Sequence, residues 1–374
     1  PKGCGGSNPP LGTFSVNGEE KKNYGGKMRV MKKIPWLFVL FFMAFVGMSS
    51  LQAQQLTKAQ FEEKMNQLQS QKKALFQEVQ EASESGDSEA YDEAKEKYEE
   101  IKEQIKELAD KYAAQKGKTA RGKKAYNDGR KSYRLKRYKQ ALEHLNESIS
   151  ILPDFVSAYV VKGMTLIRLR EYEEAETTFK KAIDIEPDND LVWGSLALLY
   201  NQMGQIDKAI ETYNTAISKD STNSKHYYRV GQLYDRKKDY RNAAKKFTMA
   251  VQVDEDYFRA YRALGVAYTN MGRFDEAVKV LNTAVSMKPK DGRALFRLCM
   301  ALIEAGDYDQ AIMAGQSALK HVRGSLKYNV HMNLGIAYRK KGDKAKAREH
   351  FQEAAKHSST SDYATWALED MKKH

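Results

Sequence analysis

The sequence predicts an all-α protein whose main part is a solenoid of stacked helical hairpins. Small residues recur at intervals of 34 over most of the chain, which is typical of helical repeat proteins. The apolar residues between them follow the three- and four-residue spacing of an α-helix. A shorter heptad pattern precedes the repeats and predicts an antiparallel coiled-coil hairpin.

An export signal is predicted near the start of the chain. Met31 and two lysines form a short basic stretch, residues 34–46 are apolar, and Ala53 offers a small residue for cleavage. The apolar run is shorter than the roughly 20 residues of a membrane-spanning helix. We therefore expect residues 31–53 to be a signal peptide, with an uncleaved anchor as the alternative. Residues 1–30 are expected to be a disordered or non-native upstream segment.

Two narrow apolar stripes occupy residues 54–118, and the predicted hairpin consists of the two helices that carry them. Thr57 is suited to cap the first helix, Gly86 to end it, and Asp87 or Ser88 to start the second. Because a narrow stripe is unstable in water, we expect the helices to pack on each other; an oligomerising coiled coil remains the alternative. The stripes are Phe61, Met65, Leu68, Leu75, Val79 and Ala82, then Tyr91, Ala94, Tyr98, Ile101, Ile105, Leu108 and Tyr112.

Three series of small residues, each with a spacing of 34, define the repeats. After a two-residue insertion near Leu326 all three series resume. Small side chains at these positions are expected to let paired helices approach closely, so a bulky replacement would cost about 1–3 kcal/mol. The series are Gly129, Gly163, Ala197, Gly231, Gly265, Cys299 and Gly335; Ala141, Ala175, Ala209, Ala243, Ala277, Ala311 and Ala347; and Ser148, Ala182, Ala216, Ala250, Ala284, Ala318 and Ala354.

Each repeat is expected to be two helices joined by a tight turn. Gly204, Gly272, Gly306 and Gly342 stand where such a turn favours a left-handed residue. The predicted repeats together cover residues 122–361. Their individual ranges are 122–155, 156–189, 190–223, 224–257, 258–291, 292–325 and 328–361.

A stack of repeats needs a polar cap on its last apolar face, and residues 362–374 are predicted to supply it as a capping helix. Ser361 or Asp362 is expected to start this helix. One set of residues in this helix has helical spacing, and we expect its apolar members to face the seventh repeat. The set is Tyr363, Trp366, Ala367 and Asp370 or Met371.

The repeats resemble the tetratricopeptide repeat (TPR) family. The stretch 193–200 and the stretch 261–268, each followed by the family's spaced alanines, carry the resemblance best. It implies a right-handed superhelical solenoid of seven helix-turn-helix repeats that binds extended peptides along a concave groove. The first helix of each repeat, helix A, lines that groove in the family.

Basic residues on helix A of the fourth to sixth repeats are the candidate binding site. Guanidinium groups bind carboxylates through two parallel hydrogen bonds, so this groove is expected to receive an acidic, extended segment of a partner protein. The alternative is that these are solvated charges paired with neighbouring acids. The expected groove residues are Lys225, Tyr228, Arg229, Gln232, Arg259, Arg262, Arg293, Phe296 and Arg297.

The resemblance also suggests a specific comparison for two of these residues. Lys225 and Arg229 match the basic pair with which carboxylate-clamp TPR domains hold a peptide's terminal carboxylate. Val160, Met164 and Ser195 depart from the residues that such a clamp uses in the two preceding repeats.

The distribution of charge and of reactive residues indicates binding rather than catalysis. The formal net charge is +13, with 11 lysines against 15 acids in residues 54–118 and the excess of positive charge mostly after residue 118. The two cysteines, Cys4 and Cys299, are far apart, and the seven histidines have no metal-ligand spacing. No phosphate loop or nucleophile motif is present. We expect no enzyme activity, cofactor or metal.

The expected function is a non-catalytic adaptor that is exported to the periplasm or secreted. Its mature form is expected to lack a membrane span, to bind no nucleic acid and to form a homo-oligomer, if any, through the hairpin. The order of signal, hairpin and repeats resembles the layout of periplasmic coordinators of envelope constriction associated with the Tol–Pal system, which implies a bacterial cell-envelope setting. The alternative partner is an anionic envelope polymer or glycan, which the basic charge would also attract.

Overall fold

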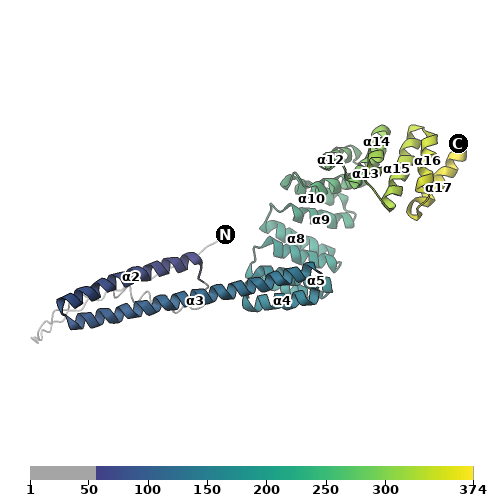
Figure 1. Cartoon of the computed structure of the whole chain (residues 1–374). Coiled ribbons are helices and arrows are strands. Elements are labelled where there is room, and N and C mark those ends of the chain that lie inside the picture. Colours follow the sequence, from purple (N-terminus) through teal and green to yellow (C-terminus); the bar gives the residue numbers. More distant parts are fainter. Residues whose placement is uncertain (1–55, 374) are drawn as a thin grey trace, which may run out of the picture. The chain divides into compact units, whose positions relative to one another are not determined.

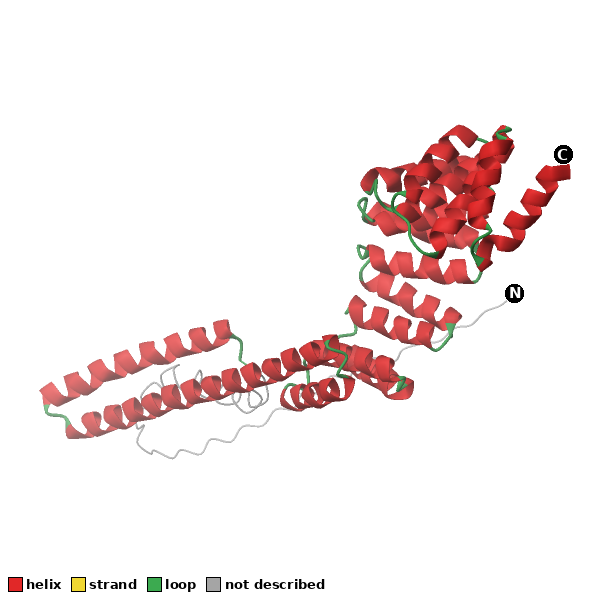
Figure 2. Cartoon of the chain, turned by 45° about the vertical axis from the view of Figure 1, so that its right-hand side comes forward, coloured by secondary structure: helices red, strands yellow, loops and turns green. Residues whose placement is uncertain are grey.

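The computed structural model describes residues 56–373, and the regular structure in this part of the chain is entirely α-helical (Figure 2). None of the helices in this range is long and apolar enough to cross a membrane. The predicted signal peptide and the upstream segment lie outside the described residues. The chain divides into two units, Pro1–Tyr112 and Ala113–His374, which are described separately below.

The described part of the first unit is a hairpin formed by α2 (Lys58–Ser85) and the first half of α3 (Ser88–Arg134) (Figure 1). The predicted ends of these helices are confirmed. Thr57 caps α2 in a reciprocal capping box, Gly86 ends it with a left-handed φ of 74°, and Asp87 accepts a hydrogen bond from a backbone N–H in the first turn of α3.

The two helices of the hairpin run antiparallel and pack through the predicted apolar stripes. Phe61, near the start of α2, stacks on Tyr112 with ring centroids 4.0 Å apart. Leu68, Ile101 and Leu108 are buried between the helices. The packing of two stripes against each other removes both from water, as the sequence predicts. Oligomerisation through this hairpin remains a prediction.

The helix α3 continues without a break through the predicted boundary between the hairpin and the first repeat. It contains 47 residues, and both Gly117 and Gly122 lie within it. The missing Cβ of Gly117 would meet no atom within 4 Å, whereas that of Gly122 would stand 2.6 Å from Leu152. One glycine is therefore simply tolerated in the helix, and the other allows close packing. The end of α3 serves as helix A of the first repeat.

The second unit consists, in its described part, of seven consecutive helix pairs and one closing helix (Figure 1). Successive helices pack on each other along the chain. The first pair is the end of α3 with α4. The helices are α4 (Tyr138–Ile151), α5 (Val156–Leu169), α6 (Tyr172–Ile185), α7 (Asp190–Gln202), α8 (Ile206–Lys219), α9 (Ser224–Arg236), α10 (Tyr240–Val253), α11 (Phe258–Asn270), α12 (Phe274–Met287), α13 (Gly292–Ala305), α14 (Tyr308–Leu319), α15 (Ser325–Lys341), α16 (Lys344–Ala354) and α17 (Ser358–Lys373).

The small residues of the repeats lie at the contacts between helices, as predicted. Every member of the second and third series, from Ala141 to Ala354, has an exposed fraction of 0%. In the first series, a Cβ added to Gly163 would stand 2.5 Å from the ring of Phe179. The glycine therefore admits a large side chain from the second helix of the same repeat, and this contact sets the distance between the two helices.

All seven turns within the repeats place one residue in the left-handed region. The four predicted glycines do so, from Gly204 with φ 78° to Gly342 with φ 92°. In the other three repeats the same position holds a long basic residue: Lys136, Arg170 or Lys238, with φ of 60–66°. The turn conformation is therefore set by the repeat geometry and is adopted even where the residue disfavours it.

The closing helix α17 begins at Ser358, before the predicted start at Ser361 or Asp362. Ala367 and Met371 are buried, as expected, and so is Ala364. Tyr363 and Trp366 also face the seventh repeat, although they are 41% and 53% exposed. The ring of Tyr363 lies 6.2 Å from that of Phe351, and the guanidinium of Arg339 lies 5.5 Å from the ring centroid of Trp366. Small alanines let α17 pack closely, and this leaves the two aromatic rings beside the contact rather than within it.

Candidate partner-binding groove

A cavity of about 510 Å³ lies over the A helices of the fourth to sixth repeats, α9, α11 and α13. Most of the residues predicted for the groove line it, so the structure brings them together. Seven of the nine do so: Tyr228, Gln232, Arg259, Arg262, Arg293, Phe296 and Arg297.

The repeat length explains why these side chains share one surface. Arg259 and Arg293 are 34 residues apart and hold the same position in consecutive A helices. Tyr228, Arg262 and Phe296 form a second row with the same spacing. Equivalent positions of stacked repeats face the same way, so each row follows the direction in which the repeats stack.

The other two predicted residues lie outside this cavity. Arg229 lines a neighbouring cavity of about 280 Å³. Its Nη1 donates a hydrogen bond to Gln232 Oε1 at 3.1 Å, and Gln232 Nε2 donates to the hydroxyl of Tyr228 at 3.2 Å. Gln232 and Asp235 line both cavities, so Arg229 is linked to the groove. Lys225 is exposed and lies outside both.

Aromatic rings form the apolar part of the groove wall. Phe296 is buried, and the ring of Tyr228 lies 5.6 Å from that of Phe247 and 5.2 Å from that of Tyr257. The guanidinium of Arg297 stands 5.5 Å from the Phe296 ring centroid, within the range of a cation–π contact. The groove therefore offers apolar contact beside positive charge.

Some lining residues were missed by sequence reasoning. Phe247 belongs to a second helix, where its spacing indicates packing only, and Asp235 is one of the neighbouring acids with which the alternative pairs the groove arginines. Leu326 lies at the insertion that breaks the 34-residue spacing. The missed lining residues are Asp235, Phe247, Ala263, Val266 and Leu326.

The electrostatics of the groove are dominated by its arginines. Four arginines and one aspartate line it, giving a net charge of +3. Burial lowers the pKa of Arg297, and the nearby Arg262 lowers it further, while Asp235 opposes both effects. Burial raises the pKa of Asp235, although Arg297 acts against this shift. A single carboxylate thus leaves most of the positive charge available to an anionic ligand.

Only one ion pair involves these groove arginines among the described residues, and it is long. Arg262 Nη1 lies 3.6 Å from Asp291 Oδ1. Among the described residues, Arg262 therefore has an acidic partner of the kind that the alternative expects, and the other groove arginines have no ion pair.

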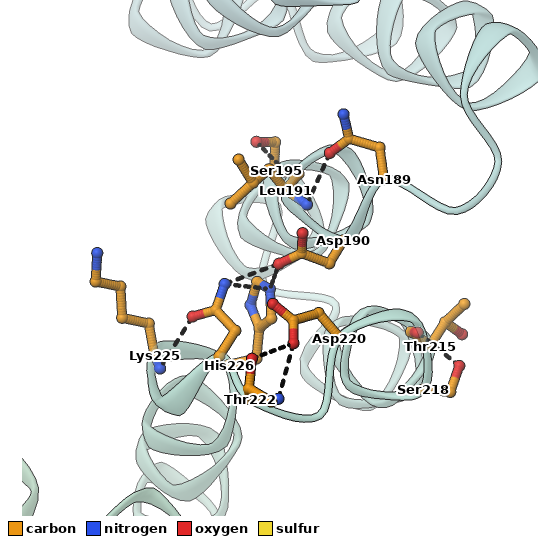
Figure 3. A network of polar contacts seen from close by, with 11 residues as sticks. Asn189, Asp190, Leu191, Ser195, Thr215, Ser218, Asp220, Thr222, Lys225 and His226 are labelled. Atoms are coloured by element: carbon orange, nitrogen blue, oxygen red, sulfur yellow. Dashed lines mark hydrogen bonds and ion pairs between the residues drawn. The ribbon is translucent and has the colours of Figure 1, made fainter. Parts of the chain in front are cut away.

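A partly buried polar network fixes the start of α9 (Figure 3). This helix carries Lys225, Tyr228 and Arg229. His226 Nε2 and Asn223 Nδ2 both donate to Asp190 Oδ2, each at 2.8 Å. The network joins the first residue of α7 to the first turn of α9. It thereby positions the A helix at one end of the groove.

The described residues contain no cluster of three or more His, Cys, Asp or Glu side chains that could hold a metal ion. Cys299 is buried, and burial raises the pKa of its thiol to about 12, so it stays protonated and unreactive at neutral pH. Chemically, the groove is equipped for charge-assisted hydrogen bonding and for aromatic contact.

Comparison with known proteins identifies the repeats. A family profile described as the Psidin N-terminal TPR repeats region matches residues 134–252. Tetratricopeptide repeat profiles match residues 236–299, 292–312 and 328–361. The sequence search among curated proteins found no significant match.

Solved TPR structures are similar to the chain. YrrB, described as a TPR protein with an unusual peptide-binding site, is 23% identical over 51% of this chain and 97% of its own, with a TM-score of 0.47. A tetratricopeptide repeat protein from Parabacteroides merdae is 18% identical over 68% of this chain and 99% of its own, with a TM-score of 0.46.

The C-terminal part of a TPR repeat-containing protein from Cytophaga hutchinsonii is 15% identical over 65% of this chain and 99% of its own, with a TM-score of 0.54. That similarity concerns the fold alone. Together with the profile matches, the paired helices and the phased small residues, it establishes the nature of the repeat region. The chain is a tetratricopeptide repeat protein.

Proposed function

We propose that this protein is a non-catalytic scaffold that binds an extended, acidic segment of a partner protein in the groove over α9, α11 and α13. The TPR fold supports a role in protein–protein interaction. The observation that carries the proposal is the cavity itself, which gathers four arginines, one aspartate and an aromatic wall.

The two rows of groove side chains suggest how such a segment is held. Arg259 and Arg293 are exposed and follow the stacking direction, so successive carboxylates of an extended chain can pair with them. Phe296 and Tyr228 offer a surface for one apolar or aromatic side chain of the same segment. Gln232, which donates a hydrogen bond to the Tyr228 hydroxyl, adds a neutral polar group to the same wall.

The setting that fits the sequence is the bacterial cell envelope or the exterior. The basic stretch and apolar run of residues 31–53 favour export of the mature chain. In this setting the hairpin of α2 and α3 serves either as a second docking element or as a site of homo-oligomerisation through its tyrosine-rich second helix.

A charge-reversal experiment tests the groove. The variant Arg259→Glu/Arg293→Glu/Arg297→Glu is compared with a control that carries the same change of charge, Lys181→Glu/Lys245→Glu/Lys279→Glu. The control lysines are exposed on the second helices of their repeats and lie outside the groove. Both variants and the parent are used to capture proteins from an envelope extract, and the retained proteins are identified by mass spectrometry.

We expect the parent and the control to retain a defined protein that the groove variant loses. Its acidic segment, made as a peptide, should then bind the parent and the control but not the groove variant. Retention of the same partner by all three proteins would contradict the proposal. Equal losses in both variants, with strong salt dependence and little sequence preference, would instead favour an anionic polymer or glycan as the ligand.

A further inference from the structure

A second cavity, of about 650 Å³, adjoins the groove near the loops that connect the repeats. It shares Arg259, Arg262 and Arg293 with the groove, so the arginine rows form the border between the two. We call it the loop pocket. It lies at the start of helices α11, α13 and α15.

Three further cations line the loop pocket and do not line the groove. Lys288 and Lys290 lie between α12 and α13, and Arg323 lies between α14 and α15. Together with the three shared arginines they give six cations against a single carboxylate, Asp291, and a net charge of +5. A cleft lined by one sign of charge raises the local concentration of anions.

Packing contacts involve Lys288 and the loop that carries Arg323. The ammonium of Lys288 lies 4.7 Å from the ring centroid of Phe258, which is buried. Val322 is buried, and a Cβ added to Gly292 would stand 2.6 Å from its Cγ1 and 3.1 Å from the backbone of the same loop. The glycine thus lets the loop pack on the start of α13, and this contact positions Arg323 next to Val322.

Backbone amides add to the positive potential. The first residues of α11, α13 and α15 all line the loop pocket. Neither Tyr257 nor Gly324, the residues that precede α11 and α15, caps its helix through a side-chain hydrogen bond, whereas Asp291 caps α13 by accepting from the Ala294 N–H. Helix starts are favourable surroundings for an anion because their N–H groups and dipole point toward it.

We propose that the loop pocket binds a phosphate monoester group. A planar carboxylate satisfies one or two guanidinium groups and carries one negative charge. A phosphate monoester presents three strong acceptor oxygens and up to two charges, so it can engage cations that approach from several helices and loops. The inference goes beyond the proposed function, since the pocket has cations of its own and its ligand need not belong to the groove's partner.

Titration with inorganic phosphate at constant ionic strength, followed by phosphorus NMR, tests the site. The variant Lys288→Gln/Lys290→Gln/Arg323→Gln is compared with Lys181→Gln/Lys245→Gln/Lys279→Gln, which removes the same charge elsewhere. We expect saturable binding by the parent and the control, and binding at least about tenfold weaker in the pocket variant. Absence of saturable binding to the parent, or equal binding by the two variants, would overturn the proposal.

A second variant separates a built pocket from simple excess charge. Gly292→Ala adds a methyl group against Val322 without changing any charge. We expect it to weaken phosphate binding because the loop that carries Arg323 must move. Unchanged affinity would show that the packing of Gly292 against the loop of Val322 and Arg323 does not form the site, and would overturn the proposal of a structured phosphate pocket.

Competition experiments distinguish the sources of the phosphate group. Displacement of bound phosphate by O-phosphoserine but not by phosphatidate vesicles assigns a soluble phosphoryl ligand, and the reverse result assigns a lipid headgroup; both support the site. Since Arg259, Arg293 and Arg297 are intact in the pocket variant, retention of the protein partner with loss of phosphate binding separates this inference from the proposed function. The groove is tested separately: the charge-reversal variant Arg259→Glu/Arg293→Glu/Arg297→Glu should lose the protein partner, whereas the pocket variant should keep it.

Discussion

Cys299 in α13 and Gly315 in α14 reverse the order in which five other repeats place a glycine and a larger side chain on the two helices. A Cβ added to Gly315 would stand 3.3 Å from Cys299 Sγ and 2.7 Å from Leu334. Elsewhere the first helix supplies the glycine and the second supplies Leu or Phe, as at Gly163 and Phe179. The sixth repeat thus keeps close packing between its helices with the sizes reversed.

This reversal predicts a measurable coupling between the two positions. Gly315→Leu should lower the free energy of unfolding by about 1–3 kcal/mol, because the new side chain overlaps Cys299 and Leu334. In the Cys299→Gly background the same change should cost less, with a coupling of about 0.5–3 kcal/mol measured by urea unfolding of all four proteins. Strict additivity of the two single effects would contradict this account of the contact.

We predict that glycine stabilises the three turns that now hold Lys136, Arg170 or Lys238. Each adopts a left-handed φ that a side chain disfavours. Replacement of any one of them by glycine should raise the free energy of unfolding by about 0.5–1 kcal/mol. This is the strain energy that is removed from the folded state, minus the free energy by which the more flexible glycine stabilises the unfolded chain.

The reverse substitution is the matched control for the turns. Gly204→Ala should destabilise by about 1 kcal/mol, because alanine must then adopt the same left-handed conformation. Since no atom lies within 4 Å of the missing Cβ, this loss cannot come from a clash. Urea midpoints at constant m-value measure both changes. A loss of stability on Lys238→Gly would refute the strain argument.

The turns also show what the sequence could and could not reveal about the fold. Glycine marks four of the seven turns, so the repeat spacing was needed to find the others. The end of the hairpin was harder to predict, because the predicted boundary between residues 118 and 122 lies inside the continuous helix α3. Helical periodicity directs Tyr363 and Trp366 toward the seventh repeat, but it does not determine how much of each ring stays exposed.

Because His226 contacts Asp190, we predict that removal of the Asp190 carboxylate strongly lowers the free energy of unfolding. In Asp190→Ala the imidazole of His226, which is 6% exposed, loses its acceptor, and the amide of Asn223 keeps only its contact with His226 Nε2 at 3.2 Å. A buried donor without a partner costs about 1–3 kcal/mol, so the free energy of unfolding should fall by at least that amount.

Asp188→Ala provides the control for this prediction. The carboxylate of Asp188 is 89% exposed and pairs with Lys219 at 2.7 Å, so its removal should cost less than about 1 kcal/mol. Equal losses in the two variants, measured by urea unfolding, would show that the network around His226 contributes no more than a surface ion pair.

The groove could be predicted from the sequence better than its surroundings. Residues on helix A faces repeat every 34 positions, and this was enough to bring seven of nine candidates to one cavity. Lys288, Lys290 and Arg323 lie in loops, where no periodicity indicates the direction of a side chain. Lys225 shares the repeat position of Arg259 but lies outside the cavity, because the lining begins one turn later on α9.

The histidine pair of the seventh repeat predicts a dependence of stability on pH. His331 Nδ1 and His350 Nδ1 are 2.9 Å apart, and His350 also stacks on Tyr338. Burial lowers the pKa of both imidazoles, and His350 lowers that of His331 further. Glu349 and Glu353 raise both pKa values, whereas Lys327 lowers that of His331 and Lys346 that of His350, so the net shift is downward.

Both shifts act on stability in the same direction. Because the folded-state pKa values lie below the ordinary value of 6.5, the unfolded chain binds more protons as the pH falls through that value. The stabilisation is complete above pH 6.5 and is lost as the pH falls toward the folded-state values. Urea unfolding at pH 7.5 and at pH 5 should show lower stability at pH 5, and His350→Gln should reduce this difference. The control His321→Gln keeps the pair and should keep the difference; equal pH dependence in the two variants would assign the effect to other groups.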